Sequence, residues 1–221
     1  MKEMGIQEKK PALLNERTLL LKPYLAQKWG LTEALIIQQI CFLSKACQYQ
    51  GVHLEAARAS YTRLQKHLSF FTRRWLIKKT KKLESEGVIQ VTRTKRVNLI
   101  GLTDSTRTFM TEQEEISVTK MIVFPSLVQK VGLSAAVLMQ QVHLRTYESN
   151  ENKGVIMSVK RWSEGVCPFF SASTVQRVLA ELKKKELIVV TKYHDEFGST
   201  NCFRINYANL EAMMKSDDAL N

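Results

Sequence analysis

Residues 21 to 43 read LKPYLAQKWGLTEALIIQQICFL, and residues 123 to 145 read VFPSLVQKVGLSAAVLMQQVHLR. The two stretches share a proline, Gln-Lys, Gly-Leu, an alanine and Gln-Gln at a constant offset of 102 residues. Further on, residues 71 to 91 (FTRRWLIKKTKKLESEGVIQV) match residues 170 to 190 (FSASTVQRVLAELKKKELIVV) at an offset of 99. Matches at fixed offsets indicate an internal repeat, so the sequence predicts two copies of one structural unit.

Each copy begins with a predicted helix, a tight turn and a second helix. A short apolar helix follows the shared proline and ends at Gly30 or Gly132. Thr32 and Ser134 then stand in N-cap position for the next helix, because a short hydroxyl side chain can accept a hydrogen bond from the first turn.

The later block predicts a third helix that runs into a β-hairpin. Thr72 and Ser171 suit the N-caps of helices over residues 73–86 and 172–185. The β-rich runs 88–102 and 187–207 each fit two strands around a polar tip. Three helices followed by a hairpin indicate a winged helix, so the expected fold class is mainly α with small β-hairpins (α+β), arranged as tandem winged helix-turn-helix domains.

The repeat also sets the expected domain limits. Residues 1–15 are predicted to be a flexible tail, 16–104 the first winged helix, 119–215 the second, and 216–221 a second tail. Residues 105–118 are polar, with little apolar periodicity, and are expected to be the linker.

The charge of the chain favours a polyanionic partner. The net charge is +12, and residues 16–104 carry 16 Lys or Arg against 6 Asp or Glu, while residues 119–215 carry 13 against 8. Such a surplus is typical of proteins that bind DNA, RNA or an anionic surface. No apolar run reaches the roughly 20 residues of a membrane span, so the chain is expected to have no membrane partner and to be cytoplasmic.

Neither a metal site nor an enzyme is predicted. Cys41, Cys47, Cys167 and Cys202 are scattered without a CxxC pair, and they are expected to be reduced thiols. The sequence contains none of the common motifs for phosphate binding, hydrolysis or zinc catalysis. We therefore expect a non-enzymatic protein with no cofactor and no metal.

The predicted third helix of the first copy carries a basic face. On a helical projection Leu76, Thr80 and Leu83 share the opposite, buried face. The candidate DNA-binding residues of this copy are Arg73, Arg74, Lys78, Lys81 and Lys82 on the helix, with Arg93, Lys95 and Arg96 on the hairpin. The alternative is that the basic helix face is simply hydrated. The hairpin that follows this helix is basic as well, which favours the DNA-binding interpretation.

The second copy has a more mixed set of candidates. They are Ser173, Gln176, Arg177, Lys183 and Lys184 on the helix and Lys192 on the hairpin. Gln and Arg can each make two hydrogen bonds to a base edge, so this copy suits base discrimination, whereas the first suits phosphate contact. Asp195 and Glu196 at the hairpin tip would partly repel phosphate, and contacts to a partner protein or a second copy remain the alternative use.

Three tryptophans and two Phe-Phe pairs leave two interpretations open. Trp29, Trp75 and Trp162 could stack on unpaired bases, or they could pack in the core. Their matched positions at helix ends favour core packing, and Trp75 is the least clear because it lies away from the buried stripe of its helix.

These residues resemble one known family. The string P-x-L-A/V-Q-K-x-G-L-[TS]-x-A-x-x-x-Q-Q, with CPFFSxSTVxRVLAEL (167–182) and FRINYxxL (203–210), is similar to the N-terminal winged-helix domain of phage replisome organisers and DnaD-like replication initiation proteins. The second copy resembles it throughout, whereas the first has Trp75 and Lys78 in place of Thr and Arg. No further helical domain of the kind that DnaD-like proteins use for helicase loading is recognised.

The resemblance implies a double-stranded DNA-binding protein that acts in replication initiation or origin organisation of a phage, plasmid or other mobile element. The expected partners are double-stranded DNA and replication proteins, and the sequence leaves monomer and homodimer open. Two alternatives remain. One is a transcriptional regulator that binds an operator through the same two units, and the other is a winged-helix scaffold for protein interactions.

Overall fold

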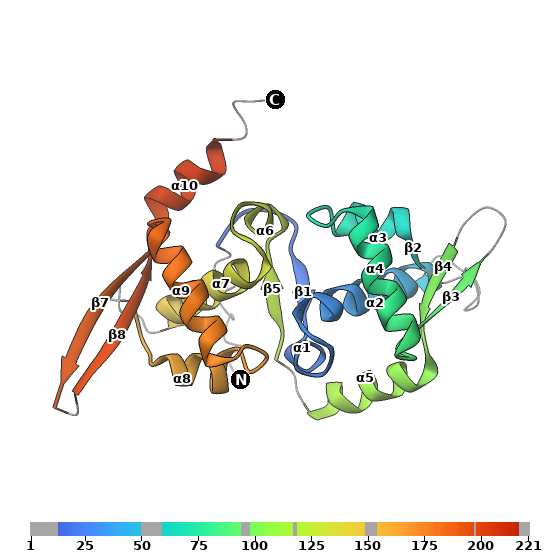
Figure 1. Cartoon of the computed structure of the whole chain (residues 1–221), viewed down its shortest axis with the longest axis horizontal. Coiled ribbons are helices and arrows are strands. Elements are labelled where there is room, and N and C mark those ends of the chain that lie inside the picture. Colours follow the sequence, from blue (N-terminus) through green and yellow to red (C-terminus); the bar gives the residue numbers. More distant parts are fainter. Residues whose placement is uncertain are drawn as a thin grey trace, which may run out of the picture. The chain divides into compact units, whose positions relative to one another are not determined.

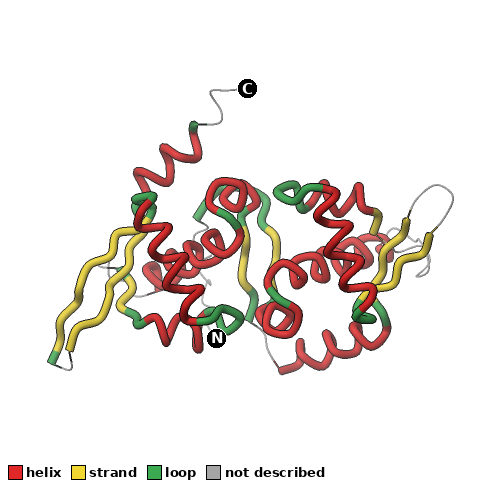
Figure 2. The backbone as a smooth tube through the Cα atoms, in the orientation of Figure 1, coloured by secondary structure: helices red, strands yellow, loops and turns green. Residues whose placement is uncertain are grey.

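The structure, a computed structural model, describes residues 13–49, 59–93, 98–116, 119–148, 154–196 and 198–216 (Figure 1). Helices predominate, and the strands form small antiparallel sheets, which confirms the predicted α+β class (Figure 2). The chain separates into two compact units, one of residues 18–129 and one built around residues 130–221, here called the first and second unit. None of the described helices has the length and apolarity needed to cross a membrane.

The first unit contains one full copy of the repeat and the start of the next. Its elements are β1 (Leu19–Leu21), α1 (Pro23–Trp29), α2 (Leu31–Tyr49), β2 (Ala59–Ser60), α3 (Tyr61–His67), α4 (Arg73–Ser85), β3 (Ile89–Arg93), β4 (Asn98–Leu102), α5 (Asp104–Ile116) and β5 (Met121–Val123). Helix α6 (Pro125–Val131) follows, and the limit between the units falls inside it. The three-stranded sheet has the order β2-β4-β3.

The second unit repeats this order of elements. It contains α7 (Leu133–Glu148), β6 (Val155–Ile156), α8 (Val159–Arg161), the π-helical turn η2 (Trp162–Val166), α9 (Ala172–Lys184), β7 (Ile188–Asp195), β8 (Gly198–Ile205) and α10 (Tyr207–Lys215). Its sheet has the equivalent order β6-β8-β7. The hairpins also start alike, because Ile89 pairs with Leu102 and Ile188 pairs with Ile205.

Helices α2 and α7 begin two residues earlier than the predicted N-caps imply, so Thr32 and Ser134 lie inside the first turn. The first hydrogen bond of each helix is instead accepted by a glycine carbonyl, at 2.9 Å for Gly30 and 3.0 Å for Gly132. Both glycines have positive φ angles, +94° and +84°, which side chains with a Cβ rarely adopt. The turn therefore depends on glycine at these two positions.

The predicted third helices match α4 and α9 closely. Thr72 and Ser171 are their N-caps, and the side-chain oxygens accept hydrogen bonds from Trp75 N at 3.3 Å and Thr174 N at 3.2 Å. The predicted buried faces are confirmed in both helices: Leu76, Thr80 and Leu83 in α4, and Val175, Val178, Leu179 and Leu182 in α9. Each stripe packs into the core of its own unit beside α2 or α7.

The segment expected to be the linker forms helix α5 instead. Thr106 and Met110 are buried, and the Phe109 ring packs edge-on against Tyr24 and Trp29 of α1, with centroids 5.9 and 5.3 Å away. Residues 117 and 118 of the expected linker lie outside the described residues. Thus α5 is part of the first unit and not a spacer between domains.

Helix α10 is the counterpart of α5 in the second unit. Thr103 Oγ1 accepts from Thr106 N at 3.4 Å, and Asn206 Oδ1 accepts from Asn209 N at 3.3 Å, so a polar residue directly after the hairpin caps both helices. The repeat therefore extends beyond the hairpin to a closing helix.

Strands β1 and β5 form a separate two-stranded antiparallel sheet. Leu19 lies opposite Val123, Leu20 opposite Ile122 and Leu21 opposite Met121. Leu20 and Ile122 occupy equivalent positions in the repeat, so equivalent residues face each other at the centre of the pair. As a result the compact first unit continues to residue 129 and does not end at the expected segment 105–118.

Candidate nucleic-acid interface

Helix α4 is fixed to the first unit from one side only. The Thr80 hydroxyl lies 3.0 Å from the Tyr61 hydroxyl of α3 and 2.9 Å from the Leu76 carbonyl oxygen. Leu76 and Leu83 are fully buried on the same face. The opposite face is left to solvent, as the helical projection predicts.

Helix α4 carries four exposed cations, of which Arg74, Lys78 and Lys81 lie on this face and Arg73 lies at the first residue of the helix. Arg73, Arg74, Lys78 and Lys81 are all exposed. Among the described residues, none of the four forms an ion pair. Four of the five helix residues proposed from the sequence therefore lie together as a positively charged surface.

The fifth predicted cation, Lys82, is partly neutralised. Its Nζ lies 3.6 Å from a carboxylate oxygen of Glu33 and 3.7 Å from one of Glu86, although its side chain is 54% exposed. Lys79, on the flank of α4, donates a hydrogen bond to Glu33 at 2.8 Å. Lys82 is thus the one predicted helix cation that meets an acid of another described helix, because Glu33 approaches from α2.

The first hairpin is only partly described. Arg93 is exposed, and its guanidinium donates to both carboxylate oxygens of Glu84 at 3.1 and 3.2 Å. Lys95 and Arg96, the other two predicted contacts, lie outside the described residues. The hairpin cation that can be placed is thus held against α4 in this structure.

Helix α9 presents every residue that the sequence proposed. Ser173, Gln176, Arg177, Lys183 and Lys184 are exposed. Arg177 donates to Glu181 at 2.8 Å within the same helix, and both side chains are more than half exposed. Exposed ion pairs of this kind contribute about 0.3–0.5 kcal/mol, so a stronger ligand can displace Glu181.

The second hairpin is longer than the first (Figure 1). Lys192 on β7 is exposed, as predicted, together with Tyr193 and His194. The cross-strand partners of Lys192 and Tyr193 are Asn201 and Thr200, which are polar and uncharged. Lys192 therefore has no acidic cross-strand partner that would compete with an anion for it. Glu196, nearer the tip of the hairpin, is also exposed.

The short helices α3 and α8, which come before α4 and α9 in the chain, hold exposed cations that were not among the predicted candidates. Ser60 and Ser158 cap α3 and α8, and each accepts a hydrogen bond, at 3.2 Å, from the backbone N–H of an arginine, Arg63 or Arg161. Both arginines are exposed. The signal was a Ser-x-x-Arg match at an offset of 98, which becomes visible only once the short helices are aligned.

The aromatic residues divide as follows. Trp162 is fully buried, which agrees with the core interpretation. Trp75 is half-buried and stacks on Phe71, with ring centroids 4.1 Å apart, while Lys79 Nζ lies 5.3 Å from its ring centroid. Both neighbours belong to the first unit, so Trp75 packs within that unit at the N-terminal end of α4.

The cysteines show no sign of metal chemistry in the described part of the chain. Cys41 is half-buried, Cys167 and Cys202 are buried, and all three are free thiols. Burial raises the pKa of Cys167 to about 12, which keeps it protonated and inert at neutral pH. The described residues contain no group of three or more His, Cys, Asp or Glu that could hold a metal ion.

Compared with protein-family models, with curated proteins and with solved structures, the chain matches none.

Proposed function

We propose that the chain binds double-stranded DNA through two winged helices, with α4 and α9 as recognition helices. The order in each unit supports this: helix, strand, helix, helix, strand, strand, with the last strand between the other two. In helix-turn-helix proteins the second helix of the motif enters the major groove while the first crosses the backbone. The hairpin that follows can reach phosphates beside the groove.

The observation that carries the proposal is the unpaired positive face of α4. No carboxylate of the described residues pairs with Arg73, Arg74, Lys78 or Lys81, so no such pair has to break before they meet phosphate. Each phosphate neutralised releases condensed counterions, which gives both affinity and a steep dependence on salt. The first unit is therefore proposed to supply affinity that depends little on sequence.

The second unit is proposed to supply discrimination between sequences. Gln176 and Arg177 lie next to each other on the exposed face of α9, where a side chain can reach a base edge. A good bidentate contact to one base is worth about 1–3 kcal/mol against the wrong base. The exposed Arg177–Glu181 pair is weak enough to be exchanged for such a contact.

Paired variants of the full chain test this division. Lys78→Ala/Lys81→Ala is expected to lower the magnitude of the log-log salt slope by roughly 0.9 for each phosphate that the variant no longer neutralises, alike for selected and random duplexes. Gln176→Ala/Arg177→Ala is expected to reduce the ratio of selected-site to random-site affinity. The measurement is fluorescence anisotropy at several salt concentrations, with the selected site taken from a random-sequence binding selection.

Lys120→Ala/Lys215→Ala is the matched control, because it removes two exposed lysines outside both faces. It is expected to change the slope less than the α4 variant does. A wild-type chain with negligible affinity for duplex DNA at physiological salt would overturn the proposal in favour of a protein-interaction scaffold. Metal-dependent turnover of DNA or nucleotide by the pure protein would contradict its non-enzymatic character.

We further propose that the DNA is a replication origin of a phage, plasmid or other mobile element, on the strength of the sequence resemblance. Replication proteins are the partners that this role implies. An operator-binding regulator would use the same two faces, so the site in the genome decides between them. Sequencing of DNA bound in cells is expected to recover clustered repeats at an origin, whereas recovery of promoters would contradict the replication role.

A further inference from the structure

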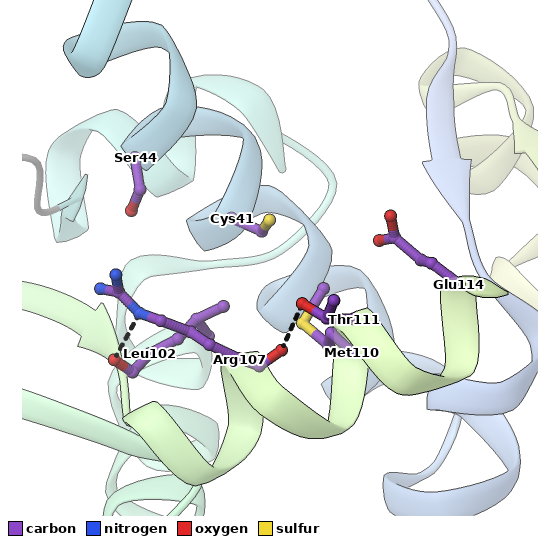
Figure 3. A pocket seen from close by; sticks show the side chains of 7 residues that line it. All are labelled: Cys41, Ser44, Leu102, Arg107, Met110, Thr111 and Glu114. Atoms are coloured by element: carbon purple, nitrogen blue, oxygen red, sulfur yellow. Dashed lines mark hydrogen bonds between the residues drawn. The ribbon is translucent and has the colours of Figure 1, made fainter.

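A small pocket lies in the first unit between α2, the end of β4 and α5 (Figure 3). Its volume is about 210 Å³, and it is lined by Cys41, Ser44, Leu102, Arg107, Met110, Thr111 and Glu114. The last four follow one face of α5 at steps of three, one and three residues. Neither recognition helix contributes to it, so the pocket belongs to a different part of the unit from the proposed DNA interface.

Arg107 gives the pocket one positively charged end. Its Nε donates to the Leu102 carbonyl oxygen at 3.3 Å, and its guanidinium extends from α5 toward α2 on the side of Ser44 (Figure 3). Arg107 is half-buried, and within the described residues it forms no ion pair. The terminal guanidinium nitrogens are thus available to a ligand.

The second unit shows what a purely structural residue does at this place. The capping residues Thr103 and Asn206 are equivalent, so Arg107 corresponds to Leu210, four residues after each cap. Leu210 is buried in its unit, at 3% exposure. The first unit has replaced a core leucine with a cation that borders a cavity, which packing alone does not require.

The remaining walls limit what can fit. Leu102 and Met110 are buried apolar residues, and Met110 presents a flexible thioether. The Glu114 carboxylate lies at the far end of the row (Figure 3). It forms an ion pair with Lys22. One end therefore favours an anion, the middle favours an apolar group, and the other end disfavours a second anion.

We propose that this pocket binds a small organic monocarboxylate with a compact apolar body. The carboxylate would meet the planar guanidinium of Arg107, whose parallel N–H groups match its two oxygens. The apolar body would lie against Leu102 and Met110. This inference goes beyond DNA binding, and its test does not involve DNA.

Benzoate is the probe, and titration calorimetry on the full chain is the measurement. Benzoate is expected to bind, whereas benzyl alcohol, which has the same ring without the charge, is expected to bind at least about tenfold more weakly. Inorganic phosphate is expected to show no comparable binding. Equal binding of benzoate and benzyl alcohol, or binding of phosphate but not benzoate, would overturn the proposal.

Arg107→Leu is the matched variant, because it installs the residue that the second unit already accommodates. It is expected to fold and to lose benzoate binding by roughly tenfold or more. Arg107→Gln serves as a second variant that keeps a polar side chain, in case leucine disturbs α5. Benzoate binding that persists in both variants contradicts the role of Arg107.

Cys41 locates the ligand, because its thiol borders the pocket. Bound benzoate is expected to slow alkylation of Cys41 by iodoacetamide in the wild-type chain and not in Arg107→Leu. Trypsin places Cys41 in residues 29–45 and Cys47 in residues 46–58, so mass spectrometry follows them separately. Calorimetric binding without any protection of Cys41 would place the ligand elsewhere and refute the assignment.

Discussion

The carboxylate of Glu33 is buried at the start of α2, where it holds two lysines of α4. Its oxygen lies 2.8 Å from Lys79 Nζ and 3.6 Å from Lys82 Nζ, and its side chain is 6% exposed. The equivalent residues of Glu33 and Lys79 in the second unit are Ala135 and Val178, both buried. These equivalent positions are thus ionic in the first unit and apolar in the second.

Lys79→Val is expected to destabilise the first unit by about 3 kcal/mol, the lower end for breaking a buried pair, because Lys82 still faces the stranded carboxylate. Glu33→Ala/Lys79→Val, which copies the second unit, is expected to recover most of this stability. Urea denaturation of both variants and the wild type measures this. A double variant no more stable than Lys79→Val would show that the apolar contact cannot be transplanted.

The same pair makes the first unit sensitive to acid. Burial alone would raise the pKa of Glu33, but the hydrogen bond from Lys79 and the charges of Lys79 and Lys82 outweigh it and lower the pKa below 4.5. A group with a lowered folded-state pKa stabilises fully above its unfolded pKa, and the contribution is lost as the pH falls through the folded value. Wild-type stability relative to Glu33→Ala/Lys79→Val is therefore expected to decline only below pH 4.5.

Gln140 is a fully buried amide in α7. Neither Nε2 nor Oε1 has a hydrogen-bond partner among the described residues. An unsatisfied buried polar group costs about 1–3 kcal/mol, so Gln140→Leu is expected to raise the free energy of unfolding of the second unit by an amount in that range. Gln140→Glu, which adds a charge in the same volume, is expected to lower it, and thermal or urea denaturation distinguishes the two signs.

Among the elements, helix α5 packs against α1 through one aromatic side chain, Phe109. Phe109 contacts Tyr24 and Trp29, and Lys28 Nζ lies 3.4 Å from its ring centroid. Phe109→Ala is expected to cost the first unit about 2 kcal/mol, less than for a fully buried phenylalanine because the ring is half exposed.

The control for Phe109→Ala is Glu112→Ala, on the exposed side of the same helix. It tests whether the loss of any side chain from α5, and not of the packed ring in particular, explains the destabilisation. Equal destabilisation by both variants in urea denaturation would mean that α5 is not anchored through Phe109.

The elements with a long apolar stripe were predictable, and those without one were not. Residues 73–86 and 172–185 were expected to be helices, and α4 and α9 differ from them by one residue at the C-terminal end. Helix α5 was missed because only Thr106 and Met110 are buried along 13 residues. Helix α3 was missed because it is short and only Tyr61 and Leu64 are buried along it.

The sequence predicted which face of α4 is exposed, but not which cations of that helix form ion pairs. A helical projection compares residues of one helix, so it separated Lys78 and Lys81 from the buried stripe. The projection gives no information about residues of other helices. It could not place Glu33 beside Lys79, because the two residues are 46 positions apart in the sequence. That Lys79 and Lys82 are already paired with Glu33 follows from the packing of α2 against α4, which a projection of one helix does not contain.

At the scale of the whole molecule, the proposed function implies that two units on one chain bind long DNA more tightly than either unit alone. Once one unit is bound, the other meets DNA at a high effective concentration. The wild type is therefore expected to bind a duplex of about 30 base pairs far more tightly than one of about 10, because only the longer one offers successive major grooves.

The control for the effect of duplex length is a variant that lacks the proposed contact residues of α9. Gln176→Ala/Arg177→Ala/Lys183→Ala is expected to show little of this increase with length while still binding the short duplex. Anisotropy titrations with both lengths measure the ratio. An increase with length that is unchanged in the variant would show that only the first unit contacts DNA.

The pairing of β1 with β5 has a consequence for the order in which the chain folds. The residues that meet there, such as Leu19 and Val123, are 104 positions apart. Closing a flexible loop of that length costs about 4 kcal/mol in chain entropy. The three residue pairs between β1 and β5 offset only a small part of this cost. We expect the helices and the hairpin between them to form first and shorten the loop, so that these strands join late. Pulse-labelled hydrogen exchange during refolding should then show the amides of residues 19–21 protected after those of α2 and α4, and simultaneous protection would contradict this order.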